Sequence, residues 1–109
     1  MTALRHIEIL RIMELQDDAL VKALKALADP TRFRMVQEIA FSGRELCCGE
    51  IAERFPLSQP TISHHLKILV EAGFLRMRPE AKHHFVSANR PFLDAVLRAL
   101  RETWRAPKK

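Results

Sequence analysis

Two adjacent cysteines, Cys47 and Cys48, carry the side chains most able to do covalent or coordination chemistry. A thiolate is a nucleophile and a ligand for soft metals. We expect a helix to begin at this pair, and a helix N-terminus lowers the pKa of a thiol placed there. A disulfide ring closed between neighbours would be strained, so the pair does not indicate a disulfide framework. The cysteines therefore favour a reducing, cytoplasmic compartment.

Four histidines occur as two adjacent pairs, His64-His65 and His83-His84. Imidazole is a common metal ligand, but neighbouring side chains on a helix or strand point apart, and no carboxylate pattern converges on these pairs. The sequence therefore does not predict a metal site built from histidines. His65 falls beside an apolar stripe, which favours a packed, hydrogen-bonded side chain.

The segment 58–72 carries polar side chains that suit nucleic-acid recognition. At helical spacing, Ile62, Leu66, Leu69 and Val70 share one face and are expected to pack inward. The opposite face and the helix start present Ser58, Gln59, Thr61, Ser63, His64 and Lys67. Such donors, acceptors and cations reach base edges in a major groove, and a helix N-terminus can receive a phosphate. A solvated polar face is the alternative interpretation.

Further cations follow in a segment of strand-like alternation. Residues 75–78 alternate with period two, 79–82 is typical of a turn, and 83–87 forms a second strand, which predicts a β-hairpin. The cationic side chains on or near its tip are Arg76, Arg78, Lys82 and His83. Cationic hairpin tips commonly touch phosphate or a minor groove, so we assign DNA contacts to Arg78 and Lys82. A solvated turn is the alternative here.

Helices are expected to position these groups, and turn or capping residues mark where they begin and end. The expected ranges are 4–15, 17–28, 29–43, 48–54, 58–72 and 89–104. Asp17 and Asp18 offer a cap for the second helix, and Asp29-Pro30 is a sharp start for the third, which directs Phe33, Val36 and Ile39 inward. Gly43 and Gly73 follow two of the helices, as C-terminal glycines do.

The short turn around Pro56 joins two of these helices in a helix-turn-helix, and the hairpin that follows is its wing. We expect a mainly α fold with a small β-hairpin, a winged helix-turn-helix that dimerises through its terminal helices. The expected division is a helical extension at 1–16, the DNA-binding and dimerisation domain at 17–105, and a tail at 106–109.

Apolar surface on both terminal helices is more than a monomer of this size covers easily. The last helix stacks Phe92, Val96 and Leu100, and its stripe runs to Trp104. Pairing the terminal helices across a twofold axis would bury this surface and set two reading helices about one DNA turn apart. In the alternative, both helices pack internally in a monomer.

Composition narrows the classes of function. The formal net charge of +5 suits double-stranded DNA as a partner but does not require it. No apolar run of transmembrane length and no signal-peptide pattern is present, so no membrane partner is expected. An enzyme is not expected, because no catalytic triad, paired carboxylates or phosphate-binding loop occurs. A helical protein-interaction module without DNA binding is the competing class.

Several motifs together resemble the ArsR/SmtB family of bacterial winged-helix repressors. The matching stretches are ALADPTRFR within 24–34, Gly49 to Ala52, SQPTISHHLKIL at 58–69, Glu71 to Leu75, and Val86 to Asn89. The resemblance covers about 19–100. It implies a dimer with contacts from the first and last helices, and repression at a palindromic operator that ends when a ligand or oxidant is sensed. By analogy, Gln59, Thr61, Ser63 and His64 would read DNA.

The resemblance is weaker at the sensor. Arsenite-responsive members carry an ELCxCDL-like stretch, whereas 44–51 here is RELCCGEI, with Gly49 in the second cysteine position and Cys48 in the spacer. The last helix lacks the Asp/His pairs of zinc-responsive relatives, since Asp94 stands alone. Three hypotheses remain: Cys47 and Cys48 bind arsenite or a soft metal ion as inducer, they sense oxidants, or they are structural and the inducer is not thiol-directed.

Overall fold

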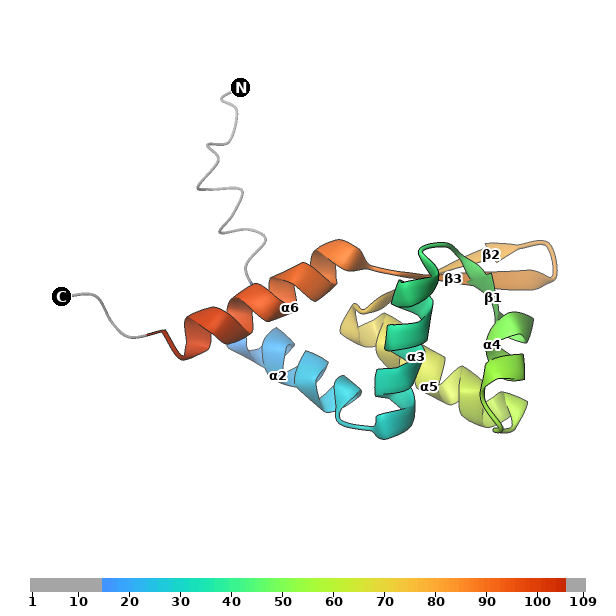
Figure 1. The fold of residues 1–109 in the computed structure, drawn as a ribbon, viewed down its shortest axis with the longest axis horizontal. Coiled ribbons are helices and arrows are strands. Elements are labelled where there is room, and N and C mark those ends of the chain that lie inside the picture. Colours follow the sequence, from blue (N-terminus) through green and yellow to red (C-terminus); the bar gives the residue numbers. More distant parts are fainter. Residues whose placement is uncertain (1–14, 106–109) are drawn as a thin grey trace, which may run out of the picture.

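The computed structural model describes residues 15–105, so the helix predicted at 4–15 and the tail at 106–109 lie outside the described residues apart from Leu15. The elements in chain order are α2 (Asp17–Leu27), α3 (Pro30–Ser42), β1 (Leu46–Cys47), α4 (Cys48–Arg54), α5 (Gln59–Ala72), β2 (Leu75–Glu80), β3 (His83–Ala88) and α6 (Arg90–Thr103). Figure 1 shows α3, α4 and α5 beside the hairpin of β2 and β3, with α2 and α6 at the other end. The predicted winged helix-turn-helix is confirmed.

Three helices begin with the same local device, a capping side chain followed by proline in the first turn. Asp29 accepts a hydrogen bond from Arg32 N–H, and the caps Ser58 and Asn89 do the same for the N–H groups three residues on. These bonds satisfy amides that have no partner inside the helix. At α2 the predicted Asp cap is wrong. Gln16 holds the cap position, and both aspartates lie in the first turn, where the helix dipole favours their charge.

Left-handed glycines end α3 and α5, as predicted. Gly43 has φ of 67° and Gly73 has φ of 112°, a region that disfavours other residues. At Gly73 space is a second constraint, because an added Cβ would lie 2.8 Å from the Phe92 ring. That ring packs edge-on against Phe74 with centroids 5.0 Å apart. The close approach fixes the start of the wing against the start of α6.

The sheet has three strands in the order β1-β3-β2, so the predicted hairpin gains a strand that the sequence did not indicate. Strand β1 is two residues long and pairs Leu46 with Val86 and Cys47 with Phe85. A segment this short carries no recognisable alternation. Strand β2 also continues through Pro79 to Glu80, so the turn is narrower than predicted, with φ of 55° at Ala81.

The core lies where α5 packs against α2, α3 and the start of the wing. Its largest fully buried side chains are Phe74, Met35, Ile39, Leu46, Ile51, Ile62, Leu66, Leu69 and Val86. The prediction that Phe33 points inward is wrong, since 53% of this side chain is exposed and Met35 is buried instead. Met35, Val36 and Ile39 form the buried face of α3, and Phe33 lies outside this face.

Helix α6 packs against α2 and buries only Val96 completely. Exposed apolar side chains remain on both helices, namely Val21 and Leu24 on α2 and Leu97, at 62%, on α6, with Trp104 just beyond it at 78%. In Figure 1 this pair of helices lies at the end of the molecule farthest from the wing. Among residues 15–105, no helix is long and apolar enough to cross a membrane.

Candidate nucleic-acid interface

The turn between α4 and α5 presents the start of α5 at the surface. Helix α4 ends at Arg54, and Phe55 turns its ring into the core. Ser58 then caps α5: its hydroxyl accepts from Thr61 N–H at 3.4 Å and lies 2.8 Å from the Thr61 hydroxyl. Two of the predicted DNA-contacting residues, Ser58 and Thr61, are thus already joined to each other. Pro60 has no N–H, so Gln59 N–H is the remaining amide of this turn that lacks a partner inside the helix.

The outer face of α5 is polar and open. Ile62, Leu66 and Leu69 are buried as predicted, and Val70 is half-buried. The residues assigned to DNA contact on the opposite face are all exposed, namely Gln59, Thr61, Ser63, His64 and Lys67. The structure therefore brings this predicted set together on one surface, which can offer hydrogen bonds to base edges and a cation to phosphate.

His65 lies on α5 behind that surface and contacts the neighbouring helices. It is half-buried, and its Nδ1 lies 3.3 Å from Nη1 of Arg32. Arg32 also donates through Nε to the carbonyl of Ala26 at 2.7 Å. The predicted packed, hydrogen-bonded histidine is confirmed, and it ties α5 to the start of α3 and the end of α2.

In the wing, Arg78 is held by partners within the protein. It donates to both carboxylate oxygens of Glu45, at 2.9 and 3.0 Å, and pairs with Glu80 at 3.3 Å. Its guanidinium lies 5.0 Å from the centroid of the Phe85 ring. The Glu45 carboxylate raises the pKa of Arg78, and Arg78 lowers the pKa of Glu45. Arg78 therefore lies at the surface, but its guanidinium already donates hydrogen bonds to Glu45.

The other wing cations are placed differently. Arg76 donates to Oδ1 of Asn89 at 3.2 Å and so joins the wing to the cap of α6. Lys82 and His83 are exposed at the tip, as predicted. Lys82 is thus the predicted wing residue that stands farthest out along the hairpin.

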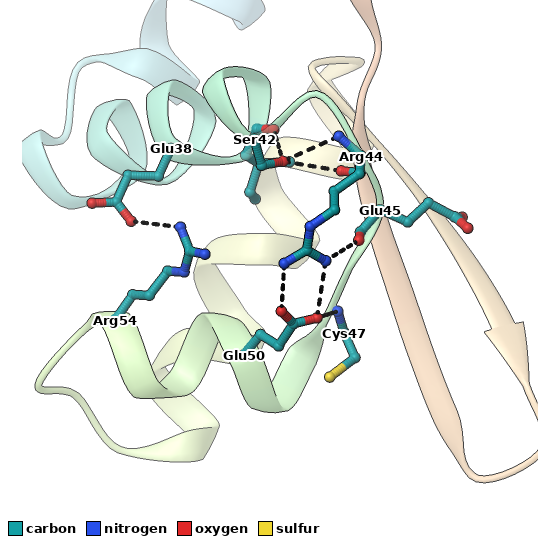
Figure 2. Close-up of polar contacts among 8 residues, drawn as sticks. Glu38, Ser42, Arg44, Glu45, Cys47, Glu50 and Arg54 are labelled. Carbon is teal, nitrogen blue, oxygen red and sulfur yellow. Dashed lines mark hydrogen bonds and ion pairs between the residues drawn. The ribbon is translucent and has the colours of Figure 1, made fainter.

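Cys47 caps α4 and belongs to a polar network at the base of the wing (Figure 2). The Glu50 carboxylate accepts from Cys47 N–H at 3.1 Å and from Arg44 at 2.8 Å. These donors, Arg44 above all, lower the pKa of Glu50 to about 2. The sulfur of Cys47 lies 3.7 Å from the point where a Cβ on Gly49 would stand.

Cys48 lies on a different surface from its neighbour. It lines a groove together with Ser63 and Lys67 of α5 and Met77 and His84 of the wing. Burial raises the pKa of its thiol, and Cys47 adds to the rise. The expectation that the helix N-terminus lowers the pKa is therefore wrong for Cys48, because desolvation disfavours the thiolate. Both cysteines are free thiols.

The sequence did not single out Glu45 or Met77. Glu45 meets Arg78 across 33 positions of the chain, and nothing local signals such a partner. Met77 appeared only as one residue of an alternating strand, yet 38% of it is exposed beside the groove. Among the described residues, no three His, Cys, Asp or Glu side chains converge as a metal site.

Comparison with known proteins agrees with this geometry. A family model described as a helix-turn-helix domain matches residues 27–78. The arsenical resistance operon repressor of Staphylococcus xylosus is 37% identical over 73 residues, covering 67% of this chain and 68% of that protein. The uncharacterised HTH-type transcriptional regulator YceK of Bacillus subtilis is 33% identical, covering 84% of this chain and 92% of that protein.

A solved structure shares the fold. The ArsR-like transcriptional regulator from Rhodococcus sp. RHA1 superposes with a TM-score of 0.70 at 23% identity, over 79% of each chain. At that identity the likeness concerns the fold, whereas the sequence relatives carry the family assignment. The chain therefore belongs to the ArsR family of winged helix-turn-helix DNA-binding transcriptional regulators.

Proposed function

We propose that this protein is a transcriptional repressor that binds a palindromic operator as a homodimer and releases it when a thiol-directed inducer binds. The observation that carries the proposal is the exposed polar face of α5 at a capped helix start. Gln59, Ser63 and His64 face outward there, and the net charge of +5 favours a polyanion. In this arrangement α5 enters the major groove.

The contacts divide into reading and anchoring groups. Gln59, Thr61, Ser63 and His64 read base edges, and the α5 N-terminus with Ser58 receives a phosphate. Lys67 adds a phosphate contact farther along the helix. Lys82 and Arg78 serve the wing, where they approach the backbone or the minor groove.

The homodimer is supported by the apolar side chains left open on α2 and α6. Leu97 on α6 is 62% exposed, and Trp104, which follows the end of α6, is 78% exposed. Large exposed apolar groups on neighbouring helices are typical of an interface. A twofold interface would present two copies of α5 to successive major grooves, about 34–36 Å apart.

Repression and the inducer are supported by the relatives and by the cysteines. Several relatives are named arsenical resistance operon repressors, among them those of Staphylococcus xylosus and Staphylococcus aureus. Arsenite requires thiolates that converge on one atom, and here the second family position is Gly49. We therefore favour a soft metal ion over arsenite as the inducer. Gly49→Cys places a second sulfur next to Cys47 and is expected to tighten arsenite binding, measured by calorimetry; unchanged binding would contradict this.

DNA binding is tested by fluorescence anisotropy with the reduced protein and DNA from upstream of its own gene. We expect tight binding that weakens steeply with salt, with a log–log slope of about −0.9 for each phosphate neutralised. A double variant, Ser63→Ala with His64→Ala, should lose the preference for this fragment over a scrambled one. Binding that ignores salt, or none at low salt, would overturn the DNA interface in favour of a protein-interaction module.

The dimer is tested by sedimentation of the same protein. Leu97→Glu places a charge on the open face of α6 and is expected to give a monomer with weakened operator binding. Phe41→Glu is the matched control, because Phe41 is a large apolar side chain that is 91% exposed on α3, which is neither of the two helices proposed to pair. The two variants should sediment differently, and a dimer that survives Leu97→Glu would exclude this interface.

A further inference from the structure

A groove at the junction of α4, α5 and the wing gathers three soft metal-ligating side chains. Its volume is about 390 Å³, and Cys48, Met77 and His84 all line it. They come from the start of α4, from β2 and from β3. Cys48 is half-buried, Met77 is 38% exposed and His84 is exposed, so the three sulfur and nitrogen groups are open to an ion from solvent.

The pairing of the strands explains why Met77 and His84 line one groove. Strand β3 lies between β1 and β2, with Cys47 opposite Phe85 and Pro79 opposite His84. Cys48 follows Cys47 directly as the first residue of α4, and it lines the same groove as His84. Met77 shares a face with Pro79 and is diagonal to His84, a separation that long side chains span. Met77 and His84 therefore lie on one face of the sheet beside α5, and Cys48 borders the same groove from the start of α4.

The chain neighbours of two of these residues do not line the groove. Cys47 and His83 each precede a member of the trio, and neither lines the groove. Successive side chains of an extended strand point to opposite faces. Cys47 is engaged in the cap of α4, and the His83 ring lies near Phe85, with ring centroids 6.5 Å apart.

The chemistry of the trio selects one class of ion. A thiolate and a thioether prefer soft cations, above all Cu(I), and imidazole suits copper as well. Calcium and magnesium require six or more oxygen ligands, and the side chains that line the groove offer only the Glu71 carboxylate and the Ser63 hydroxyl. Zinc is bound by Cys, His, Asp and Glu rather than Met, and among residues 15–105 no three of those converge.

We propose that Cys48, Met77 and His84 form a three-coordinate site for a soft monovalent cation of the Cu(I) type. On binding, the Cys48 thiol releases its proton to solvent, and the thiolate sulfur, the Met77 thioether and one His84 nitrogen each donate a lone pair to the ion. No electron is transferred. The site uses one thiol of the cysteine pair and leaves Cys47 in its capping position.

The site adjoins the DNA-contacting face, because Ser63 and Lys67 of α5 line the same groove. A cation bound between α5 and the wing fixes their relative position and adds charge beside these residues. An ion that binds the free and the DNA-bound protein unequally must change operator affinity by the same factor. We expect release, and this coupling rests on the proposed function, whereas the site itself does not.

The site is tested with the reduced full-length protein under anaerobic conditions, by competition for Cu(I) with the chromophoric chelator bicinchoninate. We expect one Cu(I) per chain and a near-ultraviolet copper–sulfur charge-transfer band. Cys48→Ser, Met77→Leu and His84→Gln should each weaken binding by at least about tenfold. The matched controls Cys47→Ser and His83→Gln, the neighbours on the opposite face, should bind as the natural chain does.

Two results would overturn the site: Met77→Leu and His84→Gln binding Cu(I) as tightly as the natural chain, or Cys47→Ser losing as much affinity as Cys48→Ser. Circular dichroism of each variant identifies losses due to unfolding, and Ag(I), which is not redox-active here, repeats the titration. The coupling is read separately by anisotropy. If the metal-free protein binds its operator and Cu(I) does not release it, the coupling is wrong. If the metal-free protein binds no DNA, the proposed function is wrong, and the metal titration still tests the site.

Discussion

On the outer face of α5, Gln59, Ser63 and Lys67 are exposed, whereas in the wing Arg78 donates two hydrogen bonds to Glu45 and stacks over Phe85. Both surfaces carry groups suited to DNA. The helix presents them on a rigid element whose inner face is fully packed, so contact with DNA costs little reorganisation. The wing arginine must exchange a carboxylate for a phosphate, so its net contribution is smaller than its charge suggests.

The comparison assigns sequence specificity to α5 and positioning on the DNA backbone to the wing. Short polar groups on α5 are able to distinguish bases, while a wing cation that changes partners senses the backbone. Glu45 also lies immediately before the strand that ends at Cys47, so Arg78 links strand β2 of the wing to the cysteine segment. The wing is thus the more adjustable of the two surfaces.

The largest effect is expected for Gln59→Ala on α5. A bidentate side-chain contact to a base contributes about 1–3 kcal/mol of discrimination, so operator affinity should fall by about 5- to 150-fold while non-specific binding changes little. Anisotropy with the operator and with a scrambled duplex measures both. Equal losses on the two duplexes would show that Gln59 does not read a base.

A smaller, sequence-independent effect is expected for Lys67→Gln. Removal of one phosphate contact should weaken binding to all duplexes alike and reduce the magnitude of the salt slope by about 1. A salt series from low to physiological ionic strength provides the slope. An unchanged slope would show that Lys67 does not contact a phosphate and only lines the groove that it shares with Cys48.

Substitutions in the Arg78–Glu45 pair should change operator affinity only weakly, and the two should act in opposite directions. Arg78→Ala is expected to weaken operator binding less than about fivefold, since the arginine gives up its ion pair to reach DNA. Glu45→Gln frees the same arginine and is expected to strengthen binding by a similar factor. Measured side by side, a loss from Arg78→Ala as large as that from Gln59→Ala would erase the distinction between the two surfaces.

The smallest effect on DNA affinity is expected at the cap of α3, which belongs to neither of the two surfaces. Asp29→Ala removes the hydrogen bond to Arg32 N–H and should lower the free energy of unfolding by about 1 kcal/mol without changing the operator affinity of the folded protein. Urea unfolding and anisotropy at matched concentration measure the two quantities. Glu53→Ala, at an exposed position on α4, serves as the control.

The stability difference at Asp29 should also depend on pH. The hydrogen bond from Arg32 lowers the pKa of Asp29 below its ordinary 3.8. A depressed pKa in the folded state gives stabilisation that is complete above the ordinary value and is lost as pH falls through the folded one. Asp29→Ala and the natural chain should therefore converge in stability below pH 4, and a constant difference down to pH 2 would contradict the carboxylate's role.

The sequence by itself determined most of the helices and the face that α5 presents. Asp29, Ser58 and Asn89 mark helix starts because a cap bonds an amide only three residues away, and Gly43 and Gly73 mark ends through their own backbone. The outer face of α5 followed from helical periodicity. These signals act within a few positions, so a single stretch of sequence carries them in full.

Only the tertiary structure decided which partners the functional groups find. In the folded chain Arg78 is bonded to Glu45, and Phe33 is exposed. Strand β1 joins the sheet, and Cys48 lines a groove together with Met77 and His84. The Arg78–Glu45 and His65–Arg32 contacts each join residues 33 positions apart. Local pattern cannot specify such pairs, because they depend on strand register and helix packing, which bring distant segments together only once the whole core has formed.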